Sequence, residues 1–246
     1  MGEFALCFQP KIEIGSRRIV GCEALVRWHS REEGAISPVE FIPLAEQTGL
    51  ILPLGRWVLH ESCRMLRRVH DAGFSDFSMA INVSPLQVVH QEFVAELRSV
   101  LEDYRAAPGH VQLELTEAVL QRDPAGTAKI LRQLTDLGVS LALDDFGTGH
   151  SSLGSLRQFP FDTVKIDRQF VSGVHRDRYN ESITRATVHL ARGLDMTVVA
   201  EGIENRQEAD FLDSIGCDLA QGFFYSGAVG ADALLQMLAA PPALPD

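Results

Sequence analysis

The sequence has few cysteines, few basic residues and no long apolar run. The four cysteines, Cys7, Cys22, Cys63 and Cys217, are scattered and form no CxxC pair, so we expect buried free thiols in a reducing compartment. No apolar stretch approaches the roughly 20 residues of a membrane helix, and nothing resembles a signal peptide. These shortages favour a cytoplasmic location, although a longer parent protein could be anchored to a membrane through other regions.

The scarcity of positive charge also limits the partners. The chain carries 22 Lys and Arg against 33 Asp and Glu, a formal net charge of −11. Such an acidic surface is poorly suited to the phosphate backbone of polymeric nucleic acid. A small anionic ligand remains compatible with it if cations are brought in locally.

Apolar runs alternate with helical patterns along nearly all of the 246 residues, a length that one α/β barrel can fill. The pattern predicts strands at Phe4–Phe8, Arg18–Val26, Ser78–Val83, Val111–Leu115, Ser140–Leu143, Thr163–Ile166, Thr197–Ala200 and Asp218–Ala220. It predicts helices from Ser37 to about Gln47 and at Leu54–His70, Glu92–Tyr104, Ala125–Leu137, Glu181–Leu194, Arg206–Ile215 and Ala231–Leu238.

Alternating strands and helices indicate a parallel sheet covered by helices, most economically a closed (β/α)8 barrel of the TIM type. The first two strands differ, because only a short turn around Ile14–Arg17 joins them. Such a turn suits an antiparallel pair and not a βαβ unit. We therefore expect residues 1–240 to form a single domain and residues 241–246 to form a C-terminal tail.

Polar residues recur at the ends of the predicted strands. They are Glu23, Asn82, Glu114, the pair Asp144 and Asp145, Lys165 with Asp167, Glu201 and Gln221. The parallel strands of a barrel end at one rim, where such folds place their chemistry. Oxygen ligands without His or Cys favour Mg²⁺ or Mn²⁺ over zinc. A carboxylate pair can serve two ions about 3.5–4 Å apart, as in displacement at phosphorus. Lys165 could orient a water molecule or neutralise a phosphate.

A simpler interpretation applies to each acid taken alone, because an Asp or Glu after a strand often caps the next helix. Agreement among seven strand ends is much harder to explain in that way. The glycines at positions 147 and 149 could likewise form an ordinary turn.

Several motifs resemble those of one family. Glu23-Ala24-Leu25, followed by Val26-Arg27-Trp28, resembles the signature of EAL domains, the cyclic di-GMP phosphodiesterases of bacterial signalling. The resemblance continues, in order and over nearly the whole chain, at Gln9–Pro10, Phe41–Glu46, Ile81–Pro85, Glu114–Glu117, Asp144–Gly149, Val164–Asp167, Ala200–Glu204 and Gln221–Phe223.

The resemblance implies a barrel whose first strand is antiparallel to the others, and hydrolysis of cyclic di-GMP to linear pGpG. It also implies a homodimer and regulatory domains. The chain starts almost at its first strand, without the helix that usually leads into such domains. We therefore expect a catalytic domain excised from a longer sensor protein.

The resemblance also assigns roles to residues. Glu23, Asn82, Glu114 and Asp144 match the ligands of one ion, and Asp144, Asp145 and Glu201 match the set around a second. Lys165 matches the lysine that positions the attacking water, and Glu201 is an alternative general base. The substrate-binding positions are matched by Gln9, Leu25, Arg27, Asp167, Glu204 and Gln221. Glu117 matches the anchor of a loop at Phe146–Ser152.

Two other functions remain open at this point. Domains of this kind that lose ligands bind cyclic di-GMP without cleaving it, and a related barrel could act on another phosphodiester. The guanine-contacting rim is also open, because Tyr225–Val229 lacks the proline often found after its serine. For a complete site we expect Mg²⁺ or Mn²⁺ to support hydrolysis. Ca²⁺, with longer and looser coordination, is expected to inhibit it.

Overall fold

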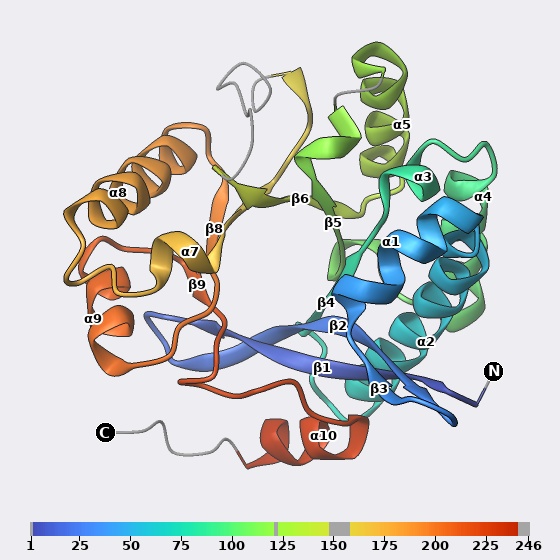
Figure 1. Cartoon of the computed structure of the whole chain (residues 1–246), viewed down its shortest axis with the longest axis horizontal. Coiled ribbons are helices and arrows are strands. Elements are labelled where there is room, and N and C mark those ends of the chain that lie inside the picture. Colours follow the sequence, from blue (N-terminus) through green and yellow to red (C-terminus); the bar gives the residue numbers. More distant parts are fainter. Residues whose placement is uncertain (1, 121–122, 148–157, 241–246) are drawn as a thin grey trace.

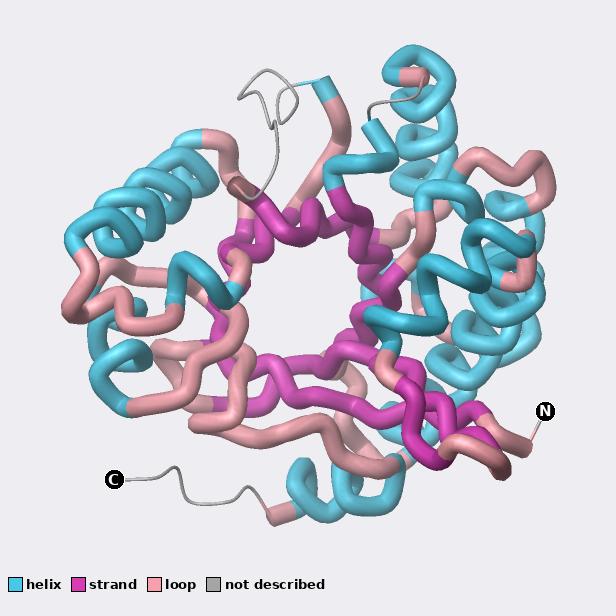
Figure 2. The backbone as a smooth tube through the Cα atoms, in the orientation of Figure 1, coloured by secondary structure: helices cyan, strands magenta, loops and turns pink. Residues whose placement is uncertain are grey.

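The computed structural model describes residues 2–120, 123–147 and 158–240, which form a ring of strands surrounded by helices (Figures 1 and 2). Eight strands close the barrel in the order β1-β9-β8-β7-β6-β5-β4-β2, and β1 pairs with β2. Their bounds are β1 Phe4–Glu13, β2 Arg18–Ser30, β4 Ser78–Asn82, β5 Val111–Thr116, β6 Ser140–Phe146, β7 Thr163–Ile166, β8 Thr197–Ala200 and β9 Leu219–Ala220. The predicted barrel is confirmed.

The longer helices lie outside the ring of strands (Figure 2). They are α1 Pro38–Thr48, α2 Ile51–Asp71, α4 Phe93–Tyr104, α5 Pro124–Asp136, α8 Arg178–Gly193, α9 Arg206–Ser214 and α10 Ala231–Ala239. Short helical turns occur at α3 Pro85–Val88, α7 Arg168–Val171, η1 Pro108–His110 and η2 Glu117–Leu120. Within the described part of the chain, no helix is both long enough and apolar enough to cross a bilayer.

The first strand runs against the rest of the barrel, as predicted. β1 is antiparallel to both of its neighbours, β2 and β9, whereas the other neighbouring strands of the ring are parallel. The turn between β1 and β2 is too short for a crossover helix. In the β1–β2 hairpin Gln9 lies opposite Glu23, so the reversed strand still contributes a side chain next to Glu23, in the middle of β2.

Some elements extend beyond the predicted ranges. β1 continues from Phe8 to Glu13 and β2 from Val26 to Ser30, where a third strand, β3 Gly34–Ile36, pairs with it. Pro10 and Lys11 break the apolar pattern that defined the first strand in the sequence. In the structure both are buried in the barrel wall. Lys11 points to the inner face, where it contacts the polar side chains of Gln112 and Glu114.

The strands are buried on both faces, but the two faces differ in character. On β5, Leu113 and Leu115 are fully buried and belong to the apolar core, whereas Gln112 and Glu114 occupy the alternate positions. Since successive side chains of a strand point to opposite faces, the leucines and the polar pair lie on opposite sides of the wall. The polar side chains line the interior and lead to the functional site.

Candidate active site

Lys165, on β7, is the centre of the acidic cluster. Its side chain is 1% exposed. Its Nζ lies 2.6 Å from Glu114 Oε2, 2.7 Å from Glu201 Oε1, 3.2 Å from Asp144 Oδ1 and 3.6 Å from Glu23 Oε2. These carboxylates come from β2, β5, β6 and the residue after β8, so parallel strands bring together groups that are far apart in the sequence.

Side-chain amides fix the orientation of Glu23. Asn82 donates through Nδ2 to Glu23 Oε1 at 2.6 Å, and Gln221 donates through Nε2 to Glu23 Oε2 at 2.6 Å. The same Gln221 nitrogen also lies 3.0 Å from Gln9 Oε1. Gln221 Oε1 is buried and has no hydrogen-bond partner. It is therefore a spare acceptor at the edge of the cluster.

A β-bulge places two adjacent aspartates opposite one residue of the neighbouring strand. Leu143 pairs with Val164 and Phe146 pairs with Ile166, so Asp144 and Asp145 together lie opposite the single residue Lys165. A regular strand would point adjacent side chains to opposite faces, whereas a bulge re-aims them. Asp145 has a φ of 54°, a left-handed conformation that aspartate tolerates better than most residues. Conformations of this kind cost about 1–3 kcal/mol and cluster at functional sites.

The cluster holds more negative than positive charge. Burial alone would lower the pKa of Lys165, but the carboxylates of Glu114 and Glu201, followed by those of Glu23 and Asp144, raise it well above its usual value. Burial, with the charge of Glu114, raises the pKa of Glu23. The pKa of Glu201 rises to about 8, mainly through burial, even though Lys165 opposes that rise.

Glu114 and Asp145 differ in pKa because they differ in their neighbours. Burial would raise the pKa of Glu114, but Lys11 and Lys165 outweigh it and lower the pKa to about 2. The pKa of Asp145 rises to about 6 through burial and the nearby charges of Asp144 and Asp167. Among the described residues, five carboxylates of this cluster thus lie around two ammonium groups, an excess of negative charge that a cation would relieve.

The donor chemistry of the cluster fits a hard divalent cation. Its ligand atoms are carboxylate and amide oxygens, which suit Mg²⁺ or Mn²⁺, and Gln221 Oε1 adds an unused acceptor. In this arrangement the carboxylates are turned toward Lys165. Among the described residues, no group of three or more His, Cys, Asp or Glu side chains is positioned to hold a metal ion. The residue types therefore fit the metal, while the observed geometry is that of a lysine-centred cluster.

Five of the six predicted substrate-binding residues, all except Asp167, lie around two hollows. One, of about 280 Å³, is lined by Gln9, Glu23, Leu25, Asp144, Lys165, Arg168, Glu201, Gly202, Glu204, Gln221, Gly222 and Phe223. Arg27 lines a neighbouring hollow of about 540 Å³, whose walls also include Glu23, Leu25, Asn82 and Glu114. Cluster residues line both hollows, so a ligand with two lobes could contact the cluster from both sides.

Two other predicted residues, Asp167 and Glu117, are not among the carboxylates that pair with Lys165. Asp167 caps α7 by accepting a hydrogen bond from Gln169 N at 2.8 Å. The simpler interpretation, that an acid after a strand caps the next helix, therefore holds for Asp167. Glu117 begins η2 and is buried. Most of the loop that Glu117 is expected to anchor, residues 148–152, lies outside the described residues, so the anchoring role stays a prediction.

Two basic residues at the site were missed by the sequence analysis. Lys11 contacts Glu114 from inside the barrel, and Arg168 lines the smaller hollow and pairs with Glu204 at 2.5 Å. Arg168 directly follows Asp167, just after the end of a predicted strand, so its place near the rim could have been predicted from the sequence. The role of Lys11 could not have been predicted in this way, because its contact with Glu114 on β5 forms only in the closed barrel.

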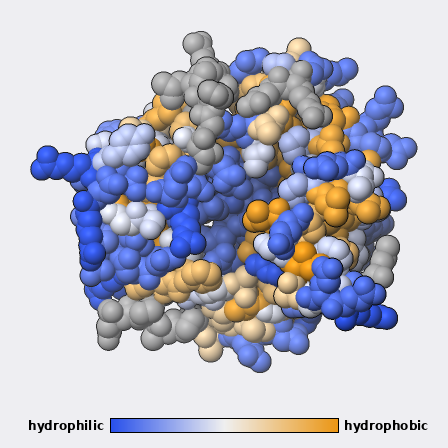
Figure 3. All heavy atoms as spheres, in the orientation of Figure 1, coloured by the Kyte–Doolittle hydropathy of each residue, from blue (hydrophilic) through white to orange (hydrophobic). Residues whose placement is uncertain are grey.

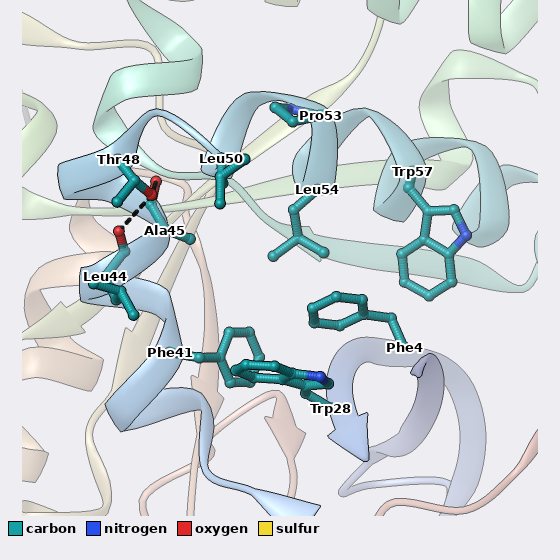
Figure 4. A pocket seen from close by; sticks show the side chains of 10 residues that line it. All are labelled: Phe4, Trp28, Phe41, Leu44, Ala45, Thr48, Leu50, Pro53, Leu54 and Trp57. Atoms are coloured by element: carbon teal, nitrogen blue, oxygen red, sulfur yellow. Dashed lines mark hydrogen bonds between the residues drawn. The ribbon is translucent and has the colours of Figure 1, made fainter. Parts of the chain in front are cut away.

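A separate apolar pocket of about 410 Å³ lies between α1, α2 and the β1–β2 hairpin. Figure 4 shows Phe4, Trp28, Phe41 and Trp57 around it together with aliphatic side chains. None of its lining residues is titratable, so it has no groups for acid–base or metal chemistry. Figure 3 shows the contrast on one face, where a hydrophilic hollow lies beside hydrophobic surface.

Gly222→Ala is expected to destabilise the fold near Gln221. A Cβ at this position would lie 2.2 Å from the carbonyl oxygen and 2.3 Å from the nitrogen of Ile203, both backbone atoms. Overpacking of this kind typically costs about 1–3 kcal/mol, measurable by urea unfolding. Gly15→Ala is the matched control, because nothing lies within 4 Å of its Cβ position. Equal stability of the two variants would contradict the close approach.

The comparisons with known proteins agree with this geometry. The sequence profile of the EAL domain matches residues 1–228. The chain is 40% identical over 237 residues to MucR of Pseudomonas aeruginosa, a bifunctional diguanylate cyclase/cyclic di-GMP phosphodiesterase, covering 96% of this chain and 35% of MucR. It is 38% identical over 224 residues to the cyclic di-GMP phosphodiesterase PdeR of Escherichia coli, covering 91% and 34% of the two chains.

The solved structure of the PaMucR phosphodiesterase in complex with c-di-GMP superimposes with a TM-score of 0.91 at 40% identity, covering 95% of this chain and 94% of that one. The chain spans about a third of the length of the curated relatives named above. On the match of profile, sequence and fold, the chain belongs to the EAL domain family.

Proposed function

We propose that this chain is a metal-dependent phosphodiesterase that hydrolyses cyclic di-GMP to linear pGpG. The observation that carries the proposal is the convergence of four carboxylates on buried Lys165 beside a hollow at the barrel rim. Relatives named cyclic di-GMP phosphodiesterases support this substrate. Every position that the family pattern assigns to metal or water positioning carries the matching residue.

The cations would be held by two overlapping sets of oxygen ligands. Glu23, Asn82, Glu114 and Asp144 would hold one Mg²⁺ or Mn²⁺, and Asp144, Asp145 and Glu201 would hold the other. When bound, such ions polarise phosphoryl oxygens and acidify water.

The chain's own residues orient the reactants. Lys165 donates hydrogen bonds toward the acidic cluster and in our proposal positions the attacking water. Glu201 lies 2.7 Å from the Lys165 ammonium, so it is placed to accept the proton that this water loses. Arg27 presents a planar guanidinium suited to a phosphate, and Leu25 lines both hollows, where its backbone can contact the ligand.

The test is incubation of the purified chain with Mg²⁺ and cyclic di-GMP, followed by separation of the nucleotides. We expect pGpG from the wild type and none from Glu23→Gln. Glu23 is a proposed carboxylate ligand of the metal ion, and Asn82 and Gln221 fix its orientation through hydrogen bonds. Glu102→Gln, an identical change at an exposed position of α4, should retain full activity. Tight binding without product would identify the alternative function, a cyclic di-GMP receptor.

The remaining expectations are also proposals. We expect a homodimer and regulation by domains outside this chain, since the relatives are about three times as long. Sedimentation of the purified chain, with and without cyclic di-GMP, tests the dimer directly.

A further inference from the structure

The interior of the barrel contains a lysine for which the proposed reaction has no role. Lys11, on β1, is 3% exposed. Its Nζ donates to Glu114 Oε1 at 2.7 Å and to Gln112 Oε1 at 3.0 Å. Gln112 in turn donates through Nε2 to Thr163 Oγ1 at 3.0 Å. A buried ammonium is costly unless it is paired and hydrogen-bonded, and here it is both.

This arrangement holds Glu114 from two sides. Lys11 binds Oε1 and Lys165 binds Oε2, so each oxygen of the carboxylate faces its own ammonium group. Small neighbours leave room for the long side chains, because Ala80 lies beside Gln112 in the sheet and Ala142 lies beside Glu114. The carboxylate therefore has one favoured orientation, set by Lys11 from the barrel interior and by Lys165 from the rim.

We propose that Lys11 is a positioning residue for this active site. It binds Oε1 of Glu114 from the inner side. The contact between Oε2 of Glu114 and the Lys165 ammonium is thereby held in one orientation at the barrel mouth. Lys11 lines neither of the two hollows where the substrate is proposed to bind. Its effect on the reaction passes through Glu114 alone, and Gln112 orients Lys11 in the same way.

Lys11→Met tests the inference, because methionine has a similar length and no charge. We expect kcat to fall by about 10- to 100-fold, the usual effect of losing a group that orients a ligand residue. KM should change by less than about threefold, since no substrate contact is removed. Lys129→Met, the same change at an exposed position of α5, is the control and should behave as the wild type.

A second variant decides the question if Lys11→Met does not fold. Gln112→Leu changes no charge and leaves the Lys11–Glu114 pair in place. It should lower kcat by about two- to tenfold, the factor of one neutral hydrogen bond, with KM unchanged. A wild-type kcat in folded Lys11→Met, or in Gln112→Leu when the first variant is unfolded, overturns the proposal.

The kinetic tests of this inference rest on the proposed function, because they measure hydrolysis of cyclic di-GMP. A crystal structure tests the inference independently of that function. In the Lys11→Met crystal structure the Glu114 carboxylate should rotate away from its wild-type orientation. If only Gln112→Leu folds, the Lys11 ammonium, no longer fixed by Gln112, should shift and move the paired Glu114 carboxylate with it. An unchanged Glu114 overturns the positioning role whatever the kinetics. If the wild type yields no pGpG, the proposed function fails, and the position of Glu114 alone then decides the inference.

Discussion

Lys165→Met is expected to lower kcat for cyclic di-GMP hydrolysis by about 10²- to 10³-fold, the scale of losing one preorganised electrostatic contact. The lysine Nζ lies within 3.6 Å of four carboxylates, so its loss removes the group proposed to position the water and, with it, the shared counter-charge. Removing one partner of a buried ion pair typically costs about 3–5 kcal/mol. We therefore expect a matching fall in the free energy of unfolding, partly restored by Mg²⁺ that binds only the folded state.

The measurements are single-turnover hydrolysis, urea unfolding with and without Mg²⁺, and calorimetric binding of cyclic di-GMP in Ca²⁺. Binding should survive in Lys165→Met, because other residues line the hollows. Lys129→Met again provides the control for an exposed lysine. A folded Lys165→Met protein with wild-type turnover would remove Lys165 from the mechanism.

The acidic rim could be predicted from the sequence because each of its residues follows a short apolar run. Glu114 and Glu201 come at the ends of segments that are unmistakably strands, and parallel strands must end together. No knowledge of side-chain packing is needed for that step. The contact between Lys11 and Glu114 joins residues 103 positions apart. This contact depends on the register of β1, β2, β4 and β5 in the closed barrel, and no local sequence pattern specifies that register.

The pair Asp144 and Asp145 marks a different limit. The sequence shows two adjacent carboxylates, and a regular strand would separate them onto opposite faces. That both lie opposite Lys165 depends on the register between β6 and β7 and on the left-handed backbone of Asp145. A glycine at this position would have indicated a left-handed backbone in the sequence, whereas an aspartate does not. Register and bulge are tertiary features, so the residues were predictable and their joint orientation was not.

Exchange of the divalent cation should have the largest effect on activity. We expect Mg²⁺ and Mn²⁺ to support hydrolysis, and Ca²⁺ to support cyclic di-GMP binding without product. Mg²⁺ requires oxygens at about 2.0–2.1 Å in near-octahedral geometry, whereas Ca²⁺ accepts about 2.3–2.6 Å and looser coordination. The proposed ligands are Asp, Asn and Glu side chains held by strands of one barrel and by one bulge. Such a set constrains the oxygen positions, so a larger ion should enter it and misplace the attacking water.

The experiment measures pGpG formation against Mg²⁺ concentration at several fixed Ca²⁺ concentrations, with binding followed by calorimetry. Ca²⁺ should raise the Mg²⁺ concentration needed for half-maximal rate and leave the maximal rate unchanged, because the two ions compete for the same oxygens. Chelation should abolish hydrolysis, and added Mg²⁺ should restore it. Full activity in Ca²⁺ alone would contradict the selection by ion size. Activity that persists after exhaustive chelation would mean that the carboxylates around Lys165 work without a bound cation. In that case the excess negative charge of the cluster would have to be balanced by protons on Glu23 and Glu201, whose pKa values are both raised mainly by burial.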